Sequence, residues 1–364
     1  MKRKLIQYLF IGLAALTFAG CGNIADALPD DDEVVEEDDE DEDEEEDEED
    51  DDDDEKPEEK SSDVNVLLSR DATSNVFFVI YPDGKERIAT LNWSDIKYFG
   101  DNCTPDLFYT ELKKNPDGFK TSPANIEEVA QAYEKIIQEG KDIISISLSS
   151  GISGAYNFTL KARELVLEKY PDAKIRCIDS LRFGSGLGLM VVYAAKMRNE
   201  GKSFEEVVDY LESNKCRFHQ MGWLDDLSFV AKKGRITPTK AFFGTLIGIK
   251  ALGEFDYNGL TTPIGKAKGE KAAFDAILGY IEKTIENPSE QIIFISQINR
   301  APKADIFKEL LEQKFHPKEI LINPVYPTCG INIGPGLLSA YYVGKPISKD
   351  LVEEKTIMEN LLSK

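Results

Sequence analysis

The sequence has little material for metal or imidazole chemistry. Its 364 residues include only two histidines, His219 and His316, and five cysteines that do not have the spacing of a metal site. We therefore expect no zinc site, no cofactor and no histidine-based catalysis. Four cysteines follow Cys21 at wide intervals: Cys103, Cys177, Cys216 and Cys329. These four could form two disulfides, but isolated thiols in the core are the better interpretation.

Outside one segment the chain also lacks net charge. Residues 30–60 hold 26 of the 67 acidic residues and two of the 43 basic ones, which leaves 41 of each sign elsewhere. Such an acidic run repels itself and offers little apolar surface, so it predicts an extended, disordered tether. The run lacks the turn glycine of an EF-hand loop, so it does not predict a calcium site of that kind. Loose condensation of divalent cations on the run is the weaker alternative to a plain spacer. The neutral remainder argues against nucleic-acid binding, which needs a basic face.

The first 20 residues are typical of a secretory signal. A basic start precedes an apolar run, Leu5 to Ala19, that is short for a transmembrane helix. The run ends in Phe18-Ala19-Gly20-Cys21, which resembles a bacterial lipobox with Phe18 at the usual leucine position. We therefore predict lipidation at Cys21 and an extracytoplasmic protein anchored to the cell membrane. A plain secreted protein and an uncleaved anchor are the alternatives.

The remaining chain predicts two domains after a signal peptide (1–20) and a disordered linker (21–61). In residues 62–214, strand-like and helix-like segments alternate, which predicts a three-layer α/β/α domain with a mostly parallel sheet. Residues 215–347 predict a smaller α+β domain, and residues 348–364 a helical tail. Helices are expected at 105–114, 125–140, 155–168, 187–197, 225–231, 241–246, 271–285 and 303–314. Strands are expected at 64–68, 75–81, 87–91, 143–146, 174–178, 217–223, 247–255, 260–264, 291–296, 319–322 and 337–343.

A loop rich in serine and glycine, residues 147–154, joins a predicted strand to a predicted helix. The first N–H groups of a helix have no partner within the helix, and the partial positive charge there favours an anion. This junction therefore predicts an anion site. A second glycine cluster, residues 184–188, lacks the spacing of a dinucleotide fingerprint, so close helix packing explains it better.

Five short motifs recur in a fixed order between residues 64 and 343. They are Thr121-Ser122-Pro123, Ser149-Ser150-Gly151-Ile152-Ser153-Gly154, Ile178-Asp179-Ser180 with Gly186-Leu187-Gly188, Lys233-Gly234-Arg235-Ile236, and Gly334-Pro335-Gly336. In order and spacing they resemble the DegV family, which includes the fatty-acid-binding FakB subunits. The resemblance implies a two-domain DegV-like fold that binds a long-chain fatty acid, or a related acyl anion, in an apolar tunnel between the domains. It implies a binding protein rather than an enzyme.

The resemblance also implies which hydroxyl groups hold the carboxylate. Thr121 and Ser153 match the two family positions that hydrogen-bond it, and Ser122 and Ser150 stand beside them. Two hydroxyls and the amides of a helix N-terminus can satisfy a buried carboxylate. A tail of about 15 methylenes, at roughly 0.8 kcal/mol each, would supply most of the affinity.

The cationic side of the implied site departs from the family. Arg235 matches the family's head-group arginine, but Asn332 stands where FakB members have a histidine. Asparagine can hydrogen-bond but cannot become a cation, so we expect binding without phosphorylation. A cytosolic fatty-acid kinase is an unexpected partner, because ATP is not available outside the membrane.

Residues 187–190 and 242–247 are suitable walls for the implied tunnel and equally suitable as core.

Two other classes of function stay open. A serine hydrolase could use Ser150 or Ser153, although the loop lacks the Gly-x-Ser-x-Gly elbow and neither histidine lies in a motif. An extracytoplasmic scaffold could keep the fold with a vestigial pocket, because fold does not fix function.

Overall fold

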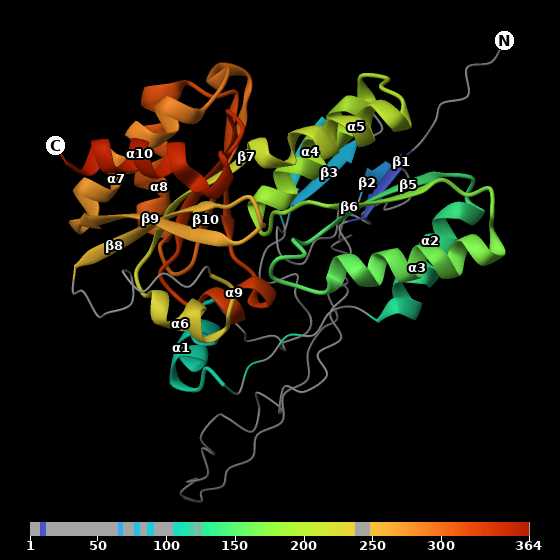
Figure 1. Cartoon of the computed structure of the whole chain (residues 1–364), viewed down its shortest axis with the longest axis horizontal. Coiled ribbons are helices and arrows are strands. Elements are labelled where there is room, and N and C mark those ends of the chain that lie inside the picture. Colours follow the sequence, from blue (N-terminus) through green and yellow to red (C-terminus); the bar gives the residue numbers. More distant parts are fainter. Residues whose placement is uncertain are drawn as a thin grey trace, which may run out of the picture.

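The computed structural model describes residues 105–117, 119, 121, 125–236 and 248–363, with four strands from the N-terminal part. Those strands are β1 (Tyr8–Ile11), β2 (Asn65–Leu67), β3 (Val76–Ile80) and β4 (Glu86–Thr90). Ser122, Cys21, Cys103, the acidic run and the helix expected at 241–246 lie outside the described residues. Figure 1 shows two bodies side by side, with α4 between them.

The N-terminal body has three layers around a small parallel sheet. Its elements are β5 (Asp142–Ser147), β6 (Ile175–Asp179), α2 (Ile126–Gln138), α3 (Ala155–Lys169), α4 (Ser185–Asn199) and α5 (Phe204–Asn214). β5 pairs in parallel with β1 on one side and β6 on the other. Helices α2 and α3 cover one face, and α4 and α5 cover the other. Local signals set the helix starts: Asn125 caps α2, and Ser203 forms a capping box with Glu206 at α5.

The C-terminal body is built on a six-stranded sheet in the order β11-β10-β12-β7-β8-β9. These strands are β7 (Phe218–Leu224), β8 (Ile249–Phe255), β9 (Thr261–Lys268), β10 (Ile292–Gln297), β11 (Glu319–Pro324) and β12 (Leu338–Val343). Helices α7 (Gly269–Thr284), α8 (Ala301–Phe315) and α10 (Val352–Leu362) pack on one face. Helix α4 of the N-terminal body packs against β7, β10 and β12, so the two bodies share one core.

The expectation of a mostly parallel sheet was wrong. Among the described strands, parallel pairing is confined to β1-β5-β6 and to β10 with β11. Strands β2, β3 and β4 pair antiparallel, because short connections reverse the chain between them. The same reason makes β8 and β9 an antiparallel hairpin, and β7 and β12 are also antiparallel. The fold is a mixed α/β fold whose sheets are mostly antiparallel.

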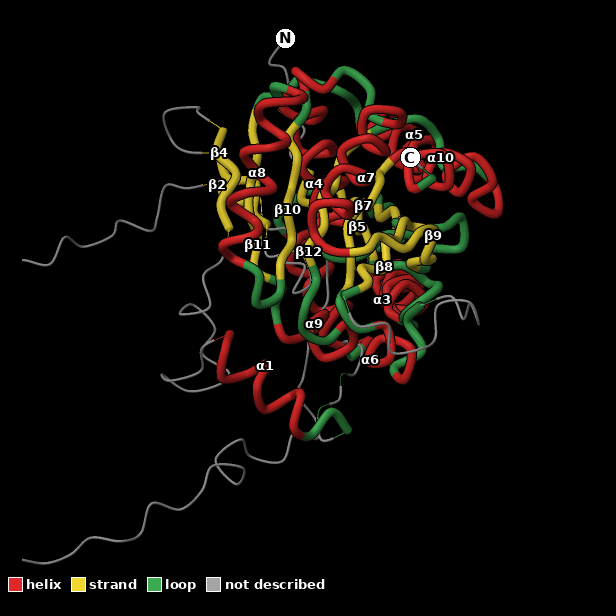
Figure 2. Tube along the Cα trace, turned by 90° about the vertical axis from the view of Figure 1, so that its left-hand side faces the viewer, coloured by secondary structure: helices red, strands yellow, loops and turns green. Residues whose placement is uncertain are grey.

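Three short helices pack together beside the large sheet, as Figure 2 shows. They are α1 (Pro105–Lys114), α6 (Leu227–Lys232) and α9 (Pro327–Ile333). The residues of α9 carry no predicted element. Tyr109 of α1 donates a hydrogen bond to the carbonyl of Val325 at 2.8 Å. A Cβ on Gly330 would lie 2.1 Å from the Tyr109 hydroxyl oxygen, so α9 needs glycine to approach α1 this closely.

The two bodies meet at the serine-rich loop. The Ser149 hydroxyl donates to the carbonyl of Gly259 at 2.7 Å, and Gly259 lies in the β8–β9 hairpin turn. Gly259 has a φ of +77°, and a Cβ there would lie 2.0 Å from the Ser149 oxygen. A Cβ on Gly151 would lie 2.3 Å from the carbonyl oxygen of Asn258. The turn is therefore seated directly on the loop.

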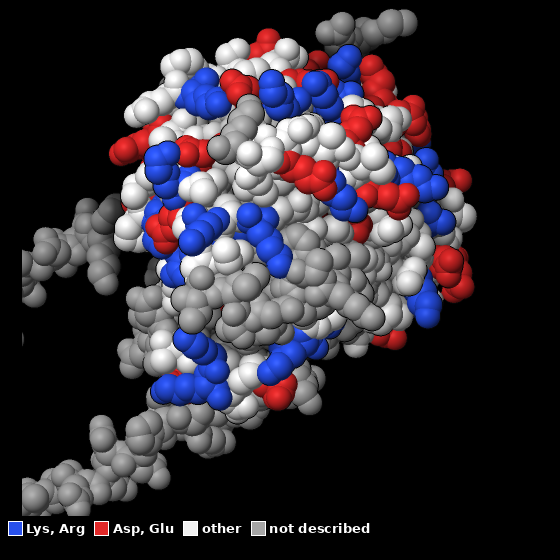
Figure 3. Space-filling view, turned by 60° about the vertical axis from the view of Figure 1, so that its left-hand side comes forward, with Lys and Arg blue, Asp and Glu red and all other residues white. Residues whose placement is uncertain are grey.

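The described surface carries charges of both signs. In Figure 3, Lys and Arg are interspersed with Asp and Glu over the face in view, which fits the neutral count of the chain outside the acidic run. Within the described ranges, no helix combines the length and apolar character that a bilayer span requires.

The seated turn predicts a difference between two glycine substitutions. Gly140→Ala should lower the free energy of unfolding by about 1–2 kcal/mol, because Gly140 has a φ of +73° and open space around it. Gly259→Ala should cost at least about 1 kcal/mol more, since it adds a steric overlap with Ser149 to the same backbone strain. Urea unfolding of both variants measures the difference. Equal losses would show that the turn is not seated on the loop.

Candidate functional site

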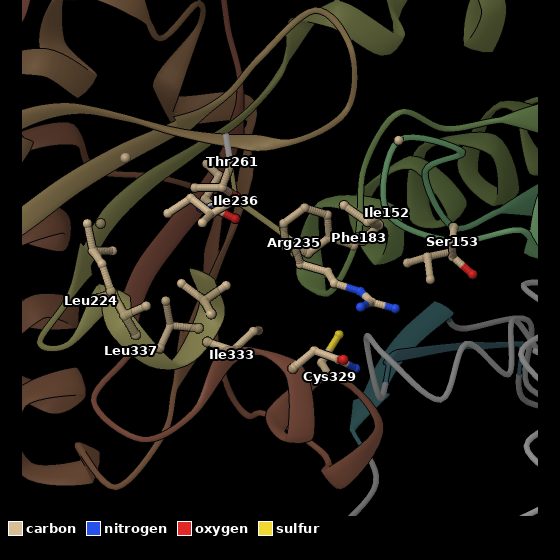
Figure 4. A pocket seen from close by; sticks show the side chains of 18 of the residues that line it. Ile152, Ser153, Phe183, Leu224, Arg235, Ile236, Thr261, Cys329, Ile333 and Leu337 are labelled. Atoms are coloured by element: carbon tan, nitrogen blue, oxygen red, sulfur yellow. Dashed lines mark hydrogen bonds between the residues drawn. The ribbon is translucent and has the colours of Figure 1, made fainter. Parts of the chain in front are cut away.

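A cavity of about 460 Å³ lies between the two bodies (Figure 4). Its volume is in the range of small-molecule sites. Most of its wall is apolar, from Leu148, Ile152 and Phe183 of the first body and Leu224, Ile236 and Leu337 of the second. A cavity with this lining favours an apolar ligand that both bodies contact.

Five of the six predicted site residues line this cavity: Thr121, Ser150, Ser153, Arg235 and Asn332. They come from four separate motifs, and the fold brings them together. In Figure 4 the Arg235 side chain extends toward Ser153 from the opposite wall. The sixth residue, Ser122, lies outside the described residues.

The hydrogen bonds within the loop decide which donors are left for a ligand. Ser149 fixes the turn, because its hydroxyl oxygen accepts from the N–H of Gly151 and its carbonyl accepts from Ile152 and Ser153. The Ser153 oxygen accepts from the N–H of Ala155 at 3.2 Å. Among the described residues, the hydroxyl hydrogen of Ser153 and the N–H of Gly154 keep no protein acceptor. Both donors are therefore available to a ligand acceptor at the N-terminus of α3.

Ser150 has a structural partner instead. Its hydroxyl donates to Oδ2 of Asp179 at 2.5 Å, and its N–H donates to Oδ1 of the same carboxylate at 3.1 Å. Asp179 also accepts from the N–H of Leu181 at 3.1 Å. This carboxylate at the end of β6 therefore ties Ser150 to the neighbouring strand, and Ser150 orients the loop.

Asn332 and Thr121 form a second hydrogen-bonded pair that lines the cavity. The Asn332 amide nitrogen donates to the Thr121 hydroxyl oxygen at 3.3 Å and to the carbonyl of Thr328 at 3.1 Å. The Thr121 oxygen acts as the acceptor, so its hydrogen can point to a ligand. Lys233 positions this segment, because its amine donates to the carbonyls of Pro116 at 2.7 Å and Phe119 at 3.2 Å.

Arg235 is the one charged side chain among the described residues that line the cavity. It is half-buried, and one of its terminal nitrogens donates to the carbonyl of Lys233. A guanidinium has five N–H donors in a planar fork, so this bond leaves donors for a carboxylate. Burial raises the pKa of Tyr341, another lining residue, so its phenol stays neutral.

Two other predictions turn out differently in the fold. Residues 187–190 are fully or almost fully buried in the shared core of α4 and are absent from the described cavity wall, so they are core and not tunnel. The other predicted wall, 242–247, lies outside the described residues. Cys177, Cys216 and Cys329 form no disulfide within the described residues.

Neither histidine contacts the serines of the loop. His219 is buried, with Nδ1 at 2.8 Å from Glu254 and Nε2 at 2.7 Å from the carbonyl oxygen of Lys345. His316 ends α8 at an exposed position with a φ of +48°. The hydrolase alternative therefore has no imidazole beside Ser150 or Ser153 within the described residues.

Sequence reasoning missed other polar residues of the cavity, among them Gln220, Thr261 and Cys329. A partial signal for Gln220 was available, because alternation along the predicted strand 217–223 puts Gln220 and Gly222 on one face. Thr261 and Cys329 had no local signal. They reach the cavity through the β8–β9 hairpin and through α9, which are placed by long-range packing.

Comparison with known proteins identifies relatives that cover most of the chain. A family model described as an uncharacterised protein of the DegV family matches residues 89–345. A DegV domain-containing protein of Clostridium perfringens is 33% identical over 286 residues, which is 73% of this chain and 97% of that protein. One of Lactococcus lactis is 30% identical over 62% of this chain and 78% of that protein.

Solved structures share the fold. A DegV family protein from Ruminococcus gnavus, described with vaccenic acid, matches with a TM-score of 0.61 at 22% identity, over 70% of this chain and 87% of that one. One from Eubacterium eligens, loaded with heptadecanoic acid, has a TM-score of 0.60 at 21% identity, over 74% and 92%. The Fatty Acid Kinase (Fak) B3 protein of Streptococcus pneumoniae, loaded with linoleic acid, has a TM-score of 0.59 at 20% identity, over 78% and 90%.

The tie between Asp179 and the loop predicts a stability loss. Asp179→Ala should lower the free energy of unfolding by about 2 kcal/mol, because a carboxylate that accepts three hydrogen bonds is removed. Asp172→Ala, at an exposed turn, is the matched control and should stay within about 0.5 kcal/mol. Urea unfolding checks both. The same small change in both variants would mean that Asp179 does not hold the loop.

Proposed function

The chain belongs to the DegV family, and on that premise we propose that it binds a long-chain fatty acid, or a related acyl anion, in the cavity between its two bodies. The observation that carries the proposal is the distribution of polar groups in that cavity. Ser153, with the N-terminus of α3, supplies donors on one wall, and Arg235 supplies a cation from the opposite wall. The Thr121 hydroxyl lines the same cavity. The rest of the wall is mostly apolar.

The expected energies agree with this arrangement. About 15 buried methylenes at roughly 0.8 kcal/mol each contribute about 12 kcal/mol before the cost of ordering the chain. The head group has to be paired, because an unpaired buried carboxylate costs several kcal/mol. Donors from both bodies therefore fix the position of the acid, and the tail supplies most of the affinity. The solved relatives described with vaccenic, heptadecanoic and linoleic acids support the same ligand class.

We propose binding without phosphoryl transfer. The amide nitrogen of Asn332 donates to Thr121 and to the carbonyl of Thr328, and an amide cannot become a cation. Asn332 therefore orients the Thr121 hydroxyl and adds no positive charge beside a phosphate. A cytosolic kinase partner is not part of this proposal.

The proposed location is outside the cytoplasm, with Cys21 lipidated and residues 21–61 acting as a tether. A fully extended chain of that length reaches at most about 140 Å. Support comes from the sequence alone: the basic start, the apolar run and the lipobox-like Phe18-Ala19-Gly20-Cys21. The same processing would remove β1, which pairs with β5, and would leave β5 as an edge strand.

A head-group substitution tests the ligand proposal. Octadecanoic acid should raise the melting temperature of the protein and bind measurably by calorimetry. Arg235→Gln should weaken this binding about 10- to 100-fold, because a hydrogen bond to a charged group is lost. The double variant Thr121→Val with Ser153→Ala should weaken it at least as much.

Lys232→Gln is the matched control, since Lys232 is exposed at the end of α6, close to Arg235 in the sequence, and does not line the cavity. Its affinity for octadecanoic acid should equal that of the unmodified protein. If the acid fails to bind, or if Arg235→Gln and the double variant bind it as well as the control does, the proposed site is wrong. A scaffold with a vestigial pocket would give that result.

Expression in a bacterium tests the anchor. The mature protein should fractionate with membranes and have the mass of a chain that begins at a diacylglyceryl Cys21. Cys21→Ser should stop lipidation and processing at this position, because a serine has no thiol to accept the lipid. Mature protein that starts elsewhere, or that keeps residues 1–20 without lipid, would contradict the anchor.

A further inference from the structure

A second polar pair, Gln220 with Thr261, lines the same cavity. The Gln220 amide nitrogen donates to the Thr261 hydroxyl oxygen at 3.3 Å. In the view of Figure 4, Thr261 and Ser153 lie on opposite sides of Arg235 and Phe183. Ile236, which follows Arg235, forms a β-bridge with Thr261. Thr261 therefore lies apart from Ser153, beside the segment that carries Arg235.

The fold directs Gln220 to the cavity. Side chains alternate along β7, so Gln220 and Leu224 share one face, and both line the cavity. The ring of Trp223 packs on Phe274 of α7, although Trp223 also borders the cavity. Gln220 is only 6% exposed, so its amide is withdrawn from bulk water.

The hydrogen-bonding capacity of this buried amide is mostly unused. A primary amide has two N–H donors and an oxygen that accepts two hydrogen bonds. Among the described residues, the side chain of Gln220 makes one hydrogen bond, the one to Thr261. No atom of this amide is among the fully buried atoms that lack a partner, so the amide borders accessible space, and Gln220 lines the cavity. A purely hydrocarbon chain in the cavity would cover the amide oxygen without giving it a partner, which costs free energy.

We propose that Gln220 and Thr261 recognise a hydroxyl group on the acyl chain, so that the ligand is a monohydroxylated long-chain fatty acid. This inference rests on the proposed function and narrows its ligand class. A hydroxyl group can donate to the Gln220 amide oxygen and accept from its free N–H or from the Thr261 hydroxyl. A methylene group can do neither. The carboxylate is held by Ser153 and Arg235, so the pair selects the position of the hydroxyl along the chain.

Calorimetry on the full chain tests this, with octadecanoic acid and a set of monohydroxyoctadecanoic acids that differ in hydroxyl position. At least one isomer should bind about tenfold more tightly than octadecanoic acid, as one well-made hydrogen bond allows. Gln220→Leu should abolish this preference and bind octadecanoic acid at least as tightly as the unmodified protein. Thr261→Val, which is nearly isosteric, should reduce the preference as a second variant.

Two results would overturn the inference while octadecanoic acid still binds. One is that no isomer binds more tightly than octadecanoic acid, which means that water satisfies the pair. The other is that the preference survives in a folded Gln220→Leu protein. Failure of every acid to bind, in contrast, would overturn the proposed function itself. A binding site for plain hydrocarbon chains and one for hydroxylated chains are thus distinguished by the same set of titrations.

Discussion

The site depends on how the loop after β5 satisfies its own hydrogen bonds where the two bodies meet. Ser149 bonds to the Gly259 turn and to the loop amides, and Asp179 holds Ser150. These bonds fix the loop without a ligand. They leave the hydroxyl of Ser153 and the start of α3 as donors into the cavity. The same loop therefore makes the contact between the bodies and the anion site.

The opposite wall supplies what the loop lacks. Arg235 brings a permanent positive charge from the second body. Asn332 donates to the Thr121 hydroxyl oxygen, so the hydrogen of that hydroxyl can point to a ligand. A carboxylate held there would contact both bodies, and its tail would lie along an apolar wall. The arrangement gives binding, orientation and enclosure, and within the part of the chain that the structure describes no histidine lies beside the cavity serines.

Sequence patterns led to residues that line one cavity, but not to the partners that these residues have in the fold. The loop junction and the ordered motifs placed five residues on one cavity, and local caps such as Asn125 and Ser203 set helix starts. The roles of Ser150 and Asn332 follow from partners 29 and 211 residues away, which no local pattern reveals. The sequence also did not predict the direction of the strands or the presence of α9, because sheet order and the Gly330 contact with α1 are set by long-range packing.

The central claim is that the site stabilises an ionised carboxylate, and the bound acid itself reports this. Octadecanoic acid labelled with ¹³C at its carboxyl carbon can be titrated by NMR in complex with the protein. Because hydrogen bonds and a nearby cation favour the charged form, the account predicts a bound pKa below the value of an ordinary carboxyl group. A bound acid whose pKa is raised, so that it is protonated near neutral pH, would contradict the account.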